Sequence, residues 1–300
     1  MFPTALPASI IPLPASATLQ SGLERLALLR LGFCHRLENE LLAEPFKGSM
    51  WHGAFGASLH DLAPRAYEAL MQAEQPQRSW ALRPPLMQDT RIPAGSELRG
   101  ELVLMGDAVA HADACIAALD EMGRRGLGPR RAPAVLESTS EGPCVTAWDV
   151  FHRASLVATQ ARAAALELHL RSPLRTRERG SPLHSAPSFA QLLKRSIARL
   201  VTRLPDTGHG LFATGEQATL MQTAEHVELL DHRIEAVRWQ RRSSRQQRTM
   251  PFDGLLGHVS FAPAAMAAYP WMALAEWWQL GSKTTFGLGM VEAVIRSNDR

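Results

Sequence analysis

Apolar residues along the chain follow two periods, one typical of strands and one typical of helices. Residues 24–37 are dense in leucine and predict a strand. Leu166, Leu168 and Leu170 alternate with polar residues, which predicts a half-buried strand. Residues 98–105 predict a further strand. We therefore expect strands in both halves of the chain.

Other segments carry apolar residues at the spacing of an amphipathic helix. They are residues 48–62, 111–122, 189–204 and 270–280. We expect Gly123 to end the second helix and Gly281 to end the fourth, because glycine tolerates the left-handed conformation at helix ends. Ser188 supplies an N-cap for the third. Four prolines interrupt the first twenty residues, which we expect to be an extended lead-in.

One order of elements occurs twice. A helix, a basic glycine-rich loop and a strand follow one another at 111–137, and a similar series closes the chain. The Gly-Leu-Gly motifs begin at Gly126 and Gly287, an offset of 161 residues, which indicates a tandem duplication. Each unit would have the strand, helix, two strands, helix and strand of a ferredoxin-like domain, so the predicted class is α+β. The polar stretch 138–143 then separates domains at 1–143 and 144–300.

Composition excludes several classes of protein. With 46% hydrophobic and 20% charged residues, the 300-residue chain can bury a core and is not disordered. Its three cysteines, Cys34, Cys115 and Cys144, form no C-x-x-C pair, so we expect neither a zinc knuckle nor a disulfide framework. The N-terminus lacks the basic region of a signal peptide, and prolines interrupt the apolar stretch 261–280. These observations predict a cytoplasmic protein without a membrane span.

Positive charge is concentrated in two stretches. Residues 171–203 hold eight basic residues and one acid, and residues 233–248 hold six and one. The whole chain is only +3, so the remainder is net negative. Clustered arginine on an acidic body suggests a polyanionic partner held at a defined place. Arg195, Arg199 and Arg203 recur every four residues, which predicts a row of guanidinium groups beside the apolar face of their helix.

Two loops could bind phosphate groups. The loop 281–289 has neither P-loop nor dinucleotide-binding spacing, but offers unobstructed backbone N–H groups with Lys283, Thr284 and Thr285 as added donors. A tight structural turn is the alternative. Residues 238–248 are arginine-rich without apolar periodicity, which alone would indicate a solvated loop. Together with the arginine-rich helix in the same half, both loops favour a nucleic-acid groove.

The histidines give no metal site. His226 and His232 are six residues apart, which is the wrong spacing for two ligands on one helical face. His52 and His60 lie in the first predicted helix, where a structural or exposed role is the alternative to a catalytic one.

Several segments together resemble a known family. They are FKGSMWHGAFGASLHDL, RPPL with PAGSELRGELVLMGDA, GRRGLGPRR, LHLRSPLR with SFAQLLKRSIARL, WQRRSSRQQR with FDGLLGHVSF, and LGSKTTFGLGMVEAV. In this order, from about residue 25 to 295, they resemble the CRISPR repeat-processing endoribonucleases of the RAMP superfamily. The glycine-rich loop with Gly281, Gly287 and Gly289 is the most specific element.

The resemblance implies two tandem ferredoxin-like (RRM-like) domains that bind a CRISPR repeat RNA hairpin and cleave the precursor transcript into guide RNAs. The family's chemistry uses no metal ion or cofactor. A 2′-hydroxyl attacks the adjacent phosphate, which leaves a 2′,3′-cyclic phosphate and a 5′-hydroxyl. This reaction needs a base, an acid for the departing oxygen and cations near the phosphorane.

The resemblance also implies roles for residues. The family's histidine corresponds to His52 or His60, and we favour His52 because it lies nearer the turn at Gly48. No clear match exists for the family's tyrosine. Some relatives, including those of type IV systems, use arginine and lysine instead, which makes Arg36, Lys47 and Arg242 candidates. The expected RNA-binding residues are Arg175, Lys194, Arg195, Arg199, Arg203, Arg241, Arg242, Arg245, Lys283, Thr284 and Thr285.

Three functions follow from this reading. The first is a processing ribonuclease that stays on the hairpin as a subunit of a CRISPR effector complex. The second is a non-catalytic RNA-binding subunit of the same superfamily. The third, a DNA-binding protein, is the least supported because no helix-turn-helix pattern is present.

Overall fold

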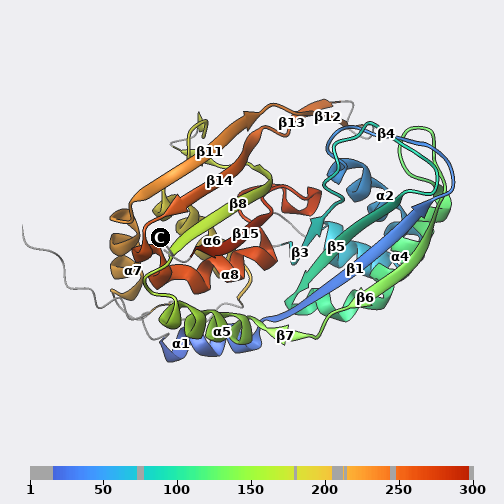
Figure 1. Ribbon diagram of the computed structural model, residues 1–300. Coiled ribbons are helices and arrows are strands. Elements are labelled where there is room, and N and C mark those ends of the chain that lie inside the picture. Colours follow the sequence, from blue (N-terminus) through green and yellow to red (C-terminus); the bar gives the residue numbers. More distant parts are fainter. Residues whose placement is uncertain are drawn as a thin grey trace, which may run out of the picture.

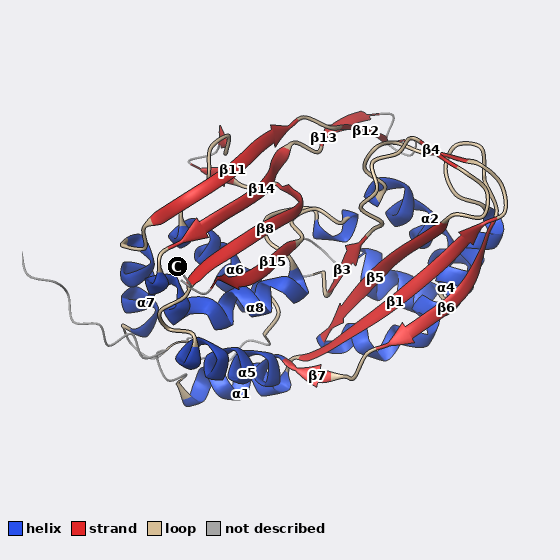
Figure 2. Cartoon of the chain, viewed as in Figure 1, coloured by secondary structure: helices blue, strands red, loops and turns tan. Residues whose placement is uncertain are grey.

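Two antiparallel sheets lie side by side, and helices cover one face of each (Figures 1 and 2). The structure is a computed structural model that describes residues 16–72, 78–178, 181–204, 212, 215–243 and 248–296. In the view of Figure 2, the other face of each sheet is turned toward the reader. The first sheet belongs to the N-terminal half of the chain and the second to the C-terminal half.

The first half has the ferredoxin-like order of elements. These elements are β1 (Ala27–Leu37), α2 (Gly48–Leu62), β3 (Trp80–Arg83), β5 (Glu97–Met105), α4 (Ala112–Arg125) and β6 (Ala134–Glu141). The strand order is β3-β5-β1-β6, and all pairs are antiparallel.

The second half repeats this arrangement. Its elements are β8 (Ala165–Leu174), α6 (Phe189–Val201), β11 (Leu229–Val237), β14 (Gly254–Phe261), α8 (Tyr269–Trp278) and β15 (Val291–Arg296). The strand order β11-β14-β8-β15 is the same permutation as in the first half. The predicted pair of ferredoxin-like units is therefore confirmed.

Shorter elements connect and flank these units. The helices are α1 (Ala17–Arg25), α3 (Pro64–Tyr67), α5 (Ala147–Gln160) and α7 (Glu216–Glu225), with a π-turn at Glu68–Gln72 and 3₁₀ turns at Gly106–His111, Pro263–Ala268 and Thr284–Phe286. The strands are β2 (Leu41–Leu42), β4 (Arg91–Ile92), β7 (Val145–Thr146), β9 (Arg177–Glu178), β10 (Ser181–Pro182), β12 (Gln240–Ser243) and β13 (Arg248–Pro251).

The structure differs from the sequence-based expectation in four places. Helix α8 ends at Trp278, before Gly281, and Gln279, with φ at 61°, follows its end. Residues 17–25 form helix α1 with Ser16 as its N-cap, so the extended lead-in does not reach residue 20. Helix α4 continues through Gly123 to Arg125, and Gly126, with φ at 85°, follows its end. The arginine-rich run 238–248 contains strand β12 and ends at the first residue of β13, which pairs with β12, so it is not simply a loop.

Two apolar cores hold the molecule together. In the first, Trp51, Phe55 and Leu119 lie between the helices α2 and α4 and their sheet. The second contains residues of α6 and α8, and also Leu28 and Met105 from the first sheet. The second core therefore crosses the domain interface, and burial of each large side chain there contributes roughly 1.5–3 kcal/mol.

The division of the chain at residue 143 stays a prediction. Strand β6 ends at Glu141, inside the polar stretch. The helices α1 and α5, which lie on either side of the first sheet in the sequence, both contribute to the second core through Leu19, Leu23 and Phe151. Among the described residues, no helix is long and apolar enough to cross a bilayer.

Candidate active site

The glycine-rich loop lies against the first turn of α2. Gly281, Gly287 and Gly289 have positive φ angles of 76°, 82° and 77°, a region that favours glycine. A Cβ atom on Gly48 would lie 1.8 Å from the carbonyl oxygen of Phe286. Glycine at the start of α2 therefore lets a helix of the first domain touch a loop of the second.

His52, one turn into α2, points to this loop. Its Nδ1 lies 3.0 Å from the carbonyl oxygen of Thr285. Its half-buried ring stacks on Phe286, with ring centroids 3.7 Å apart, and lies parallel to Trp80 at 5.6 Å. Because a carbonyl only accepts hydrogen bonds, Nδ1 donates the proton and the basic lone pair of the neutral ring is on Nε2. The fold thus fixes the tautomer of this histidine.

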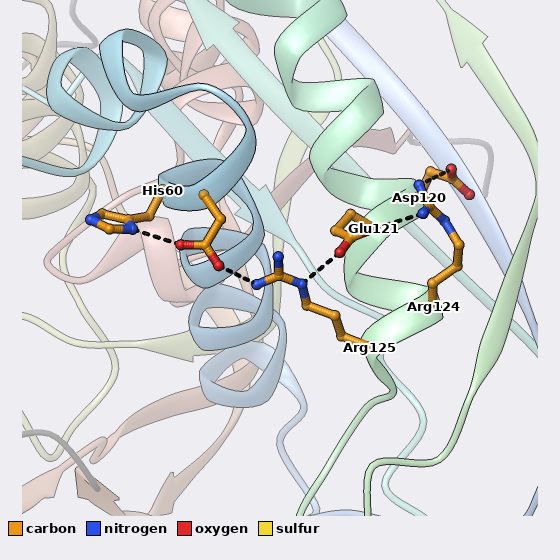
Figure 3. A network of polar contacts seen from close by, with 6 residues as sticks. His60, Asp120, Glu121, Arg124 and Arg125 are labelled. Atoms are coloured by element: carbon orange, nitrogen blue, oxygen red, sulfur yellow. Dashed lines mark hydrogen bonds and ion pairs between the residues drawn. The ribbon is translucent and has the colours of Figure 1, made fainter.

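His60, two turns further along α2, has different surroundings. Its side chain is 62% exposed, and its Nδ1 lies 2.8 Å from the carboxylate of Asp61. Asp61 also pairs with Arg125, which pairs with Glu121 on α4 (Figure 3). The hydrogen bond from His60, and then the bond from Arg125, lower the pKa of Asp61. His60 therefore belongs to an ion-pair network that joins α2 to α4.

Lys47 and Arg36, the other catalytic candidates, lie in different places. Lys47 is 1% exposed, and its Nζ donates to the carbonyl oxygens of Glu44, Pro45 and Asp89 at 2.8, 3.1 and 2.7 Å. Burial lowers the pKa of Lys47. Its ammonium group is thus engaged in holding loops together.

Arg36 lies on the sheet face opposite α2. Strand β1 alternates, so His35 contacts Trp51 of α2 while Arg36 points the other way. There Arg36 pairs with Glu97 and Glu137. The structure therefore does not bring Arg36 together with His52.

The arginines of α6 do not form the open row that the sequence predicts. Arg195 donates to the carbonyl oxygen of Arg177 at 2.5 Å. Arg199 and Arg203 turn toward the first domain, where Arg203 donates to the carbonyl oxygen of Arg78 at 2.9 Å. The expectation was wrong because helical spacing identifies a polar face without showing which part of the fold covers it.

The polar residues of the glycine-rich loop have two environments. Thr284 and Thr285 are each 3% exposed, and their hydroxyls accept from Arg199 and Arg78. They therefore face protein, whereas the sequence suggested phosphate donors. Lys283 has a φ of 63°, and its Nζ lies 5.2 Å and 5.7 Å from the ring centroids of Phe252 and Phe286. Both distances allow a cation–π interaction, next to the ring of His52 that stacks on Phe286.

The remaining RNA-binding candidates belong to the second half. Arg175 follows β8, and its backbone carbonyl accepts from Ser282. Lys194 is an exposed residue of α6. Arg241 and Arg242 lie on β12, and Arg245 lies outside the described residues.

A row of aromatic rings that the sequence did not indicate leads from the residues that flank the paired strands β12 and β13 to His52. Trp239 stacks on Phe46 with centroids 5.1 Å apart, Phe46 contacts Phe252 at 6.4 Å, and Phe252 contacts Phe286 at 5.4 Å. These residues come from three distant segments, so no local spacing marks them as neighbours.

The part of the chain that the structure describes holds one group with metal-ligand spacing, formed by Cys34, Glu97 and Glu137. Both carboxylates are paired with Arg36, and Glu97 also pairs with Arg99. This group lies on the sheet face that carries Arg36, opposite α2. It is therefore separate from His52.

The geometry around His52 suits proton transfer to or from a phosphodiester. The fixed tautomer leaves Nε2 as a base, and Lys283 brings positive charge to the same loop. A base and a nearby cation are two of the groups that transesterification of RNA requires.

Family models match both halves of the chain. A model of an N-terminal domain (AF_1859_N) matches residues 26–162. The model of the CRISPR-associated endoribonuclease Cas6 matches residues 168–291. No curated protein matches the chain.

Solved Cas6 structures share the fold over most of the chain. Thermus thermophilus Cas6 has a TM-score of 0.60 and 16% identity, over 90% of this chain and 99% of that one. A Cas6 product complex has a TM-score of 0.60 and 17% identity, over 89% and 100%. A partial Cas6-RT-Cas1–Cas2 complex has a TM-score of 0.63 and 12% identity, over 92% and 47%.

The structural matches agree with the repeated ferredoxin-like units, and the glycine-rich loop lies within the residues that the Cas6 model matches. Residues 168–291 thus match the model of the CRISPR-associated endoribonuclease Cas6, and the whole chain shares its fold with solved Cas6 structures.

Proposed function

We propose that the protein cleaves CRISPR precursor RNA within the repeat, next to the repeat hairpin, and that His52 is its catalytic base. The observation that carries this proposal is the contact between His52 and the glycine-rich loop. It joins the first domain to the loop that is the most specific element of the family resemblance. Of the two candidate histidines, only His52 contacts that loop among the described residues.

The chemical step is an internal transesterification. Nε2 of His52 removes the proton of a 2′-hydroxyl, whose oxygen attacks the adjacent phosphorus. The bond to the 5′-oxygen breaks, and that oxygen takes up a proton from solvent water as it leaves as a 5′-hydroxyl. The other product ends in a 2′,3′-cyclic phosphate. Lys283 faces the negative charge of the phosphorane.

This chemistry needs no metal ion, which gives the test. Purified protein is incubated with repeat RNA in excess EDTA, and the product ends are identified by mass spectrometry. The expected products are a 2′,3′-cyclic phosphate and a 5′-hydroxyl. A 3′-hydroxyl with a 5′-phosphate, or cleavage that EDTA abolishes, would contradict the proposed step. Tight hairpin binding without cleavage would favour a non-catalytic RNA-binding subunit.

We also propose that the protein remains on the cleaved hairpin in a CRISPR effector complex. The arginine-rich stretches support this, because many guanidinium contacts to phosphate slow dissociation. The proposed contacts are Arg175, Lys194, Arg195, Arg241, Arg242 and Arg245. In a competition assay, we expect the cleaved hairpin to dissociate more slowly than the protein cleaves it. Dissociation as fast as cleavage would contradict the proposal.

A cytoplasmic location is part of the same proposal. Cys34, Cys115 and Cys144 are free thiols. Free thiols are ordinary in a reducing compartment. Fractionation of cells that express the chain, with detection in the soluble cytoplasmic fraction, tests this location.

A further inference from the structure

Three arginines meet at the domain interface behind the glycine-rich loop. Arg203, two residues after the end of α6, donates through Nη2 to the carbonyl oxygen of Arg78 at 2.9 Å and through Nη1 to that of Arg199 at 2.6 Å. Arg78 precedes β3 in the first domain, so this arginine cluster joins the two domains. The arginine cluster consists of Arg78, Arg199 and Arg203.

The arginine cluster buries positive charge without a carboxylate partner among the described residues. Burial lowers the pKa of all three guanidinium groups, and that of Arg199 to about 10. The Nε atom of each is buried without a hydrogen-bond partner. Within the described residues, none of the three pairs with a carboxylate. Burying unpaired charges is unfavourable, so stability alone does not explain the cluster.

Two members of the arginine cluster hold the glycine-rich loop. Arg199 donates through Nη2 to the hydroxyl of Thr284 at 2.6 Å and to the carbonyl oxygen of Trp278 at 3.0 Å. Arg78 donates through Nη1 to the hydroxyl of Thr285 at 3.4 Å. The carbonyl of that same Thr285 lies 3.0 Å from Nδ1 of His52. A continuous path of hydrogen bonds and one backbone step therefore runs from α6 to the histidine.

The loop needs such support. Glycines with positive φ flank Thr284 and Thr285 at 281, 287 and 289, and Lys283 also lies in the left-handed region. Glycine gives a loop many accessible conformations. A carbonyl in this loop can fix the tautomer of His52 only if other bonds hold the loop still.

We propose that Arg199 is a positioning residue that orients His52 through Thr284 and the Thr285 carbonyl. Arg78 assists it from the other domain. This inference rests on the proposed function for its effect on catalysis, but the orientation of the His52 ring is a property of the protein alone. The role differs from RNA binding, which the sequence suggested for Arg199.

Two substitutions separate this role from loss of fold. Thr284→Val keeps the shape of the side chain and removes the acceptor while Arg199 stays in place. Arg199→Lys keeps the charge, but one ammonium group does not reproduce the planar guanidinium that reaches both Thr284 and Trp278. Arg124→Lys is the control, because Arg124 is an exposed arginine that pairs with Asp120 on α4, outside the loop and outside the proposed RNA contacts.

The first readout is kinetic. Single-turnover cleavage and hairpin affinity are measured for the three variants, with melting temperatures to verify folding. Thr284→Val and Arg199→Lys should slow cleavage by roughly tenfold or more, as misplacement of a catalytic group does, while Kd changes less than about twofold. Arg124→Lys should leave the rate near that of the wild type. An equal loss of rate and affinity, or an unchanged rate in both loop variants, would overturn the positioning role.

The second readout does not depend on cleavage. ¹⁵N NMR of the histidine rings in the RNA-free protein should show the Nδ1–H tautomer at His52 in the wild type. Thr284→Val and Arg199→Lys should give a mixture of tautomers, and Arg124→Lys should not. If the wild type does not cleave RNA but these signals change as described, the proposed function fails and the positioning role stands. Identical signals in all four proteins would refute the positioning role even if the wild type is active.

Discussion

The imidazole of His52 stacks on the ring of Phe286, with centroids 3.7 Å apart, across the interface between the two domains. The histidine comes from the first helix of the first domain, and the phenylalanine comes from the last loop of the second. Any process that separates the domains must therefore also expose His52.

Replacement of His52 by alanine should remove the base without disturbing the RNA-binding arginines. We expect single-turnover cleavage to fall by roughly a hundredfold or more, while hairpin affinity stays near that of the wild type. His60→Ala is the matched control on the same helix, since His60 contacts Asp61 and not the loop. A fully active His52→Ala protein would transfer the role to His60 or to an arginine.

Gly48→Ala should push α2 away from the glycine-rich loop. The new Cβ would meet the backbone carbonyl of Phe286 at 1.8 Å, so the chain must shift. We expect a lower melting temperature and slower cleavage together. Gly53→Ala, in the same helix, meets nothing within 4 Å. It should stabilise the helix by up to about 1 kcal/mol. Equal melting temperatures for the two variants would contradict the close contact at Gly48.

Lys47→Met should affect stability more than chemistry. The variant keeps an apolar chain of similar length but leaves three carbonyl oxygens without their donor. A hydrogen bond to a charged group contributes about 1.5–3 kcal/mol to stability, so urea denaturation should show a clearly lower free energy of unfolding. A normal free energy of unfolding with a cleavage rate reduced about a hundredfold would instead support the catalytic role that the sequence suggested for Lys47.

Glu276→Gln should change how stability depends on pH. Burial raises the pKa of Glu276 above its usual value, although Arg30 and Arg83 oppose this effect. From about pH 4.3 upward, the folded protein therefore binds this proton more tightly than the unfolded chain, and stability falls as the pH rises. Glutamine keeps an acceptor for the Ala293 amide, which lies 2.7 Å from the carboxylate. As the pH rises through this range, the melting temperature should fall less steeply for Glu276→Gln than for the wild type. An identical dependence on pH in the two proteins would show that Glu276 does not cause the fall.

Arg195→Ala and Arg242→Ala should weaken hairpin binding through lost phosphate contacts. Each lost contact should flatten the plot of log K against log salt by about one unit. Binding measured at several salt concentrations checks this. An unchanged slope for either variant would show that the residue does not meet the RNA backbone.

The repeated fold could be predicted because its signals are local. The leucine-rich strand at 24–37 and the apolar stripe of α6 show their period within one element. The Gly-Leu-Gly repeat then identifies corresponding positions in the two units, and the observed strand orders confirm the pair.

The misplaced helix end shows where local signals fail. Gly123 has the position of a C-cap in the sequence, but a Cβ there would lie 2.3 Å from the carbonyl oxygen of Ala134. That glycine is required by close packing of α4 on β6, and the helix ends later. A tertiary contact of this kind leaves no trace in the spacing of apolar residues.

The candidate site was only partly predictable for the same reason. His52 could be selected because it lies close to a glycine turn in its own segment. The burial of Lys47 depends on the carbonyl of Asp89, and the orientation of Arg199 depends on Trp278. Both partners are distant in sequence, so residue type alone predicted exposed, ligand-binding side chains.

The two Gly-Leu-Gly turns have different surroundings. At Gly126 of the first turn, a Cβ atom would meet Arg131 of its own domain, whereas at the corresponding Gly287 it would meet Pro84 of the other domain. One turn is thus an internal structural element, and its counterpart forms a contact between the two units. Under the proposed mechanism, either unit alone would lack part of the catalytic centre, so the two units must stay together for cleavage.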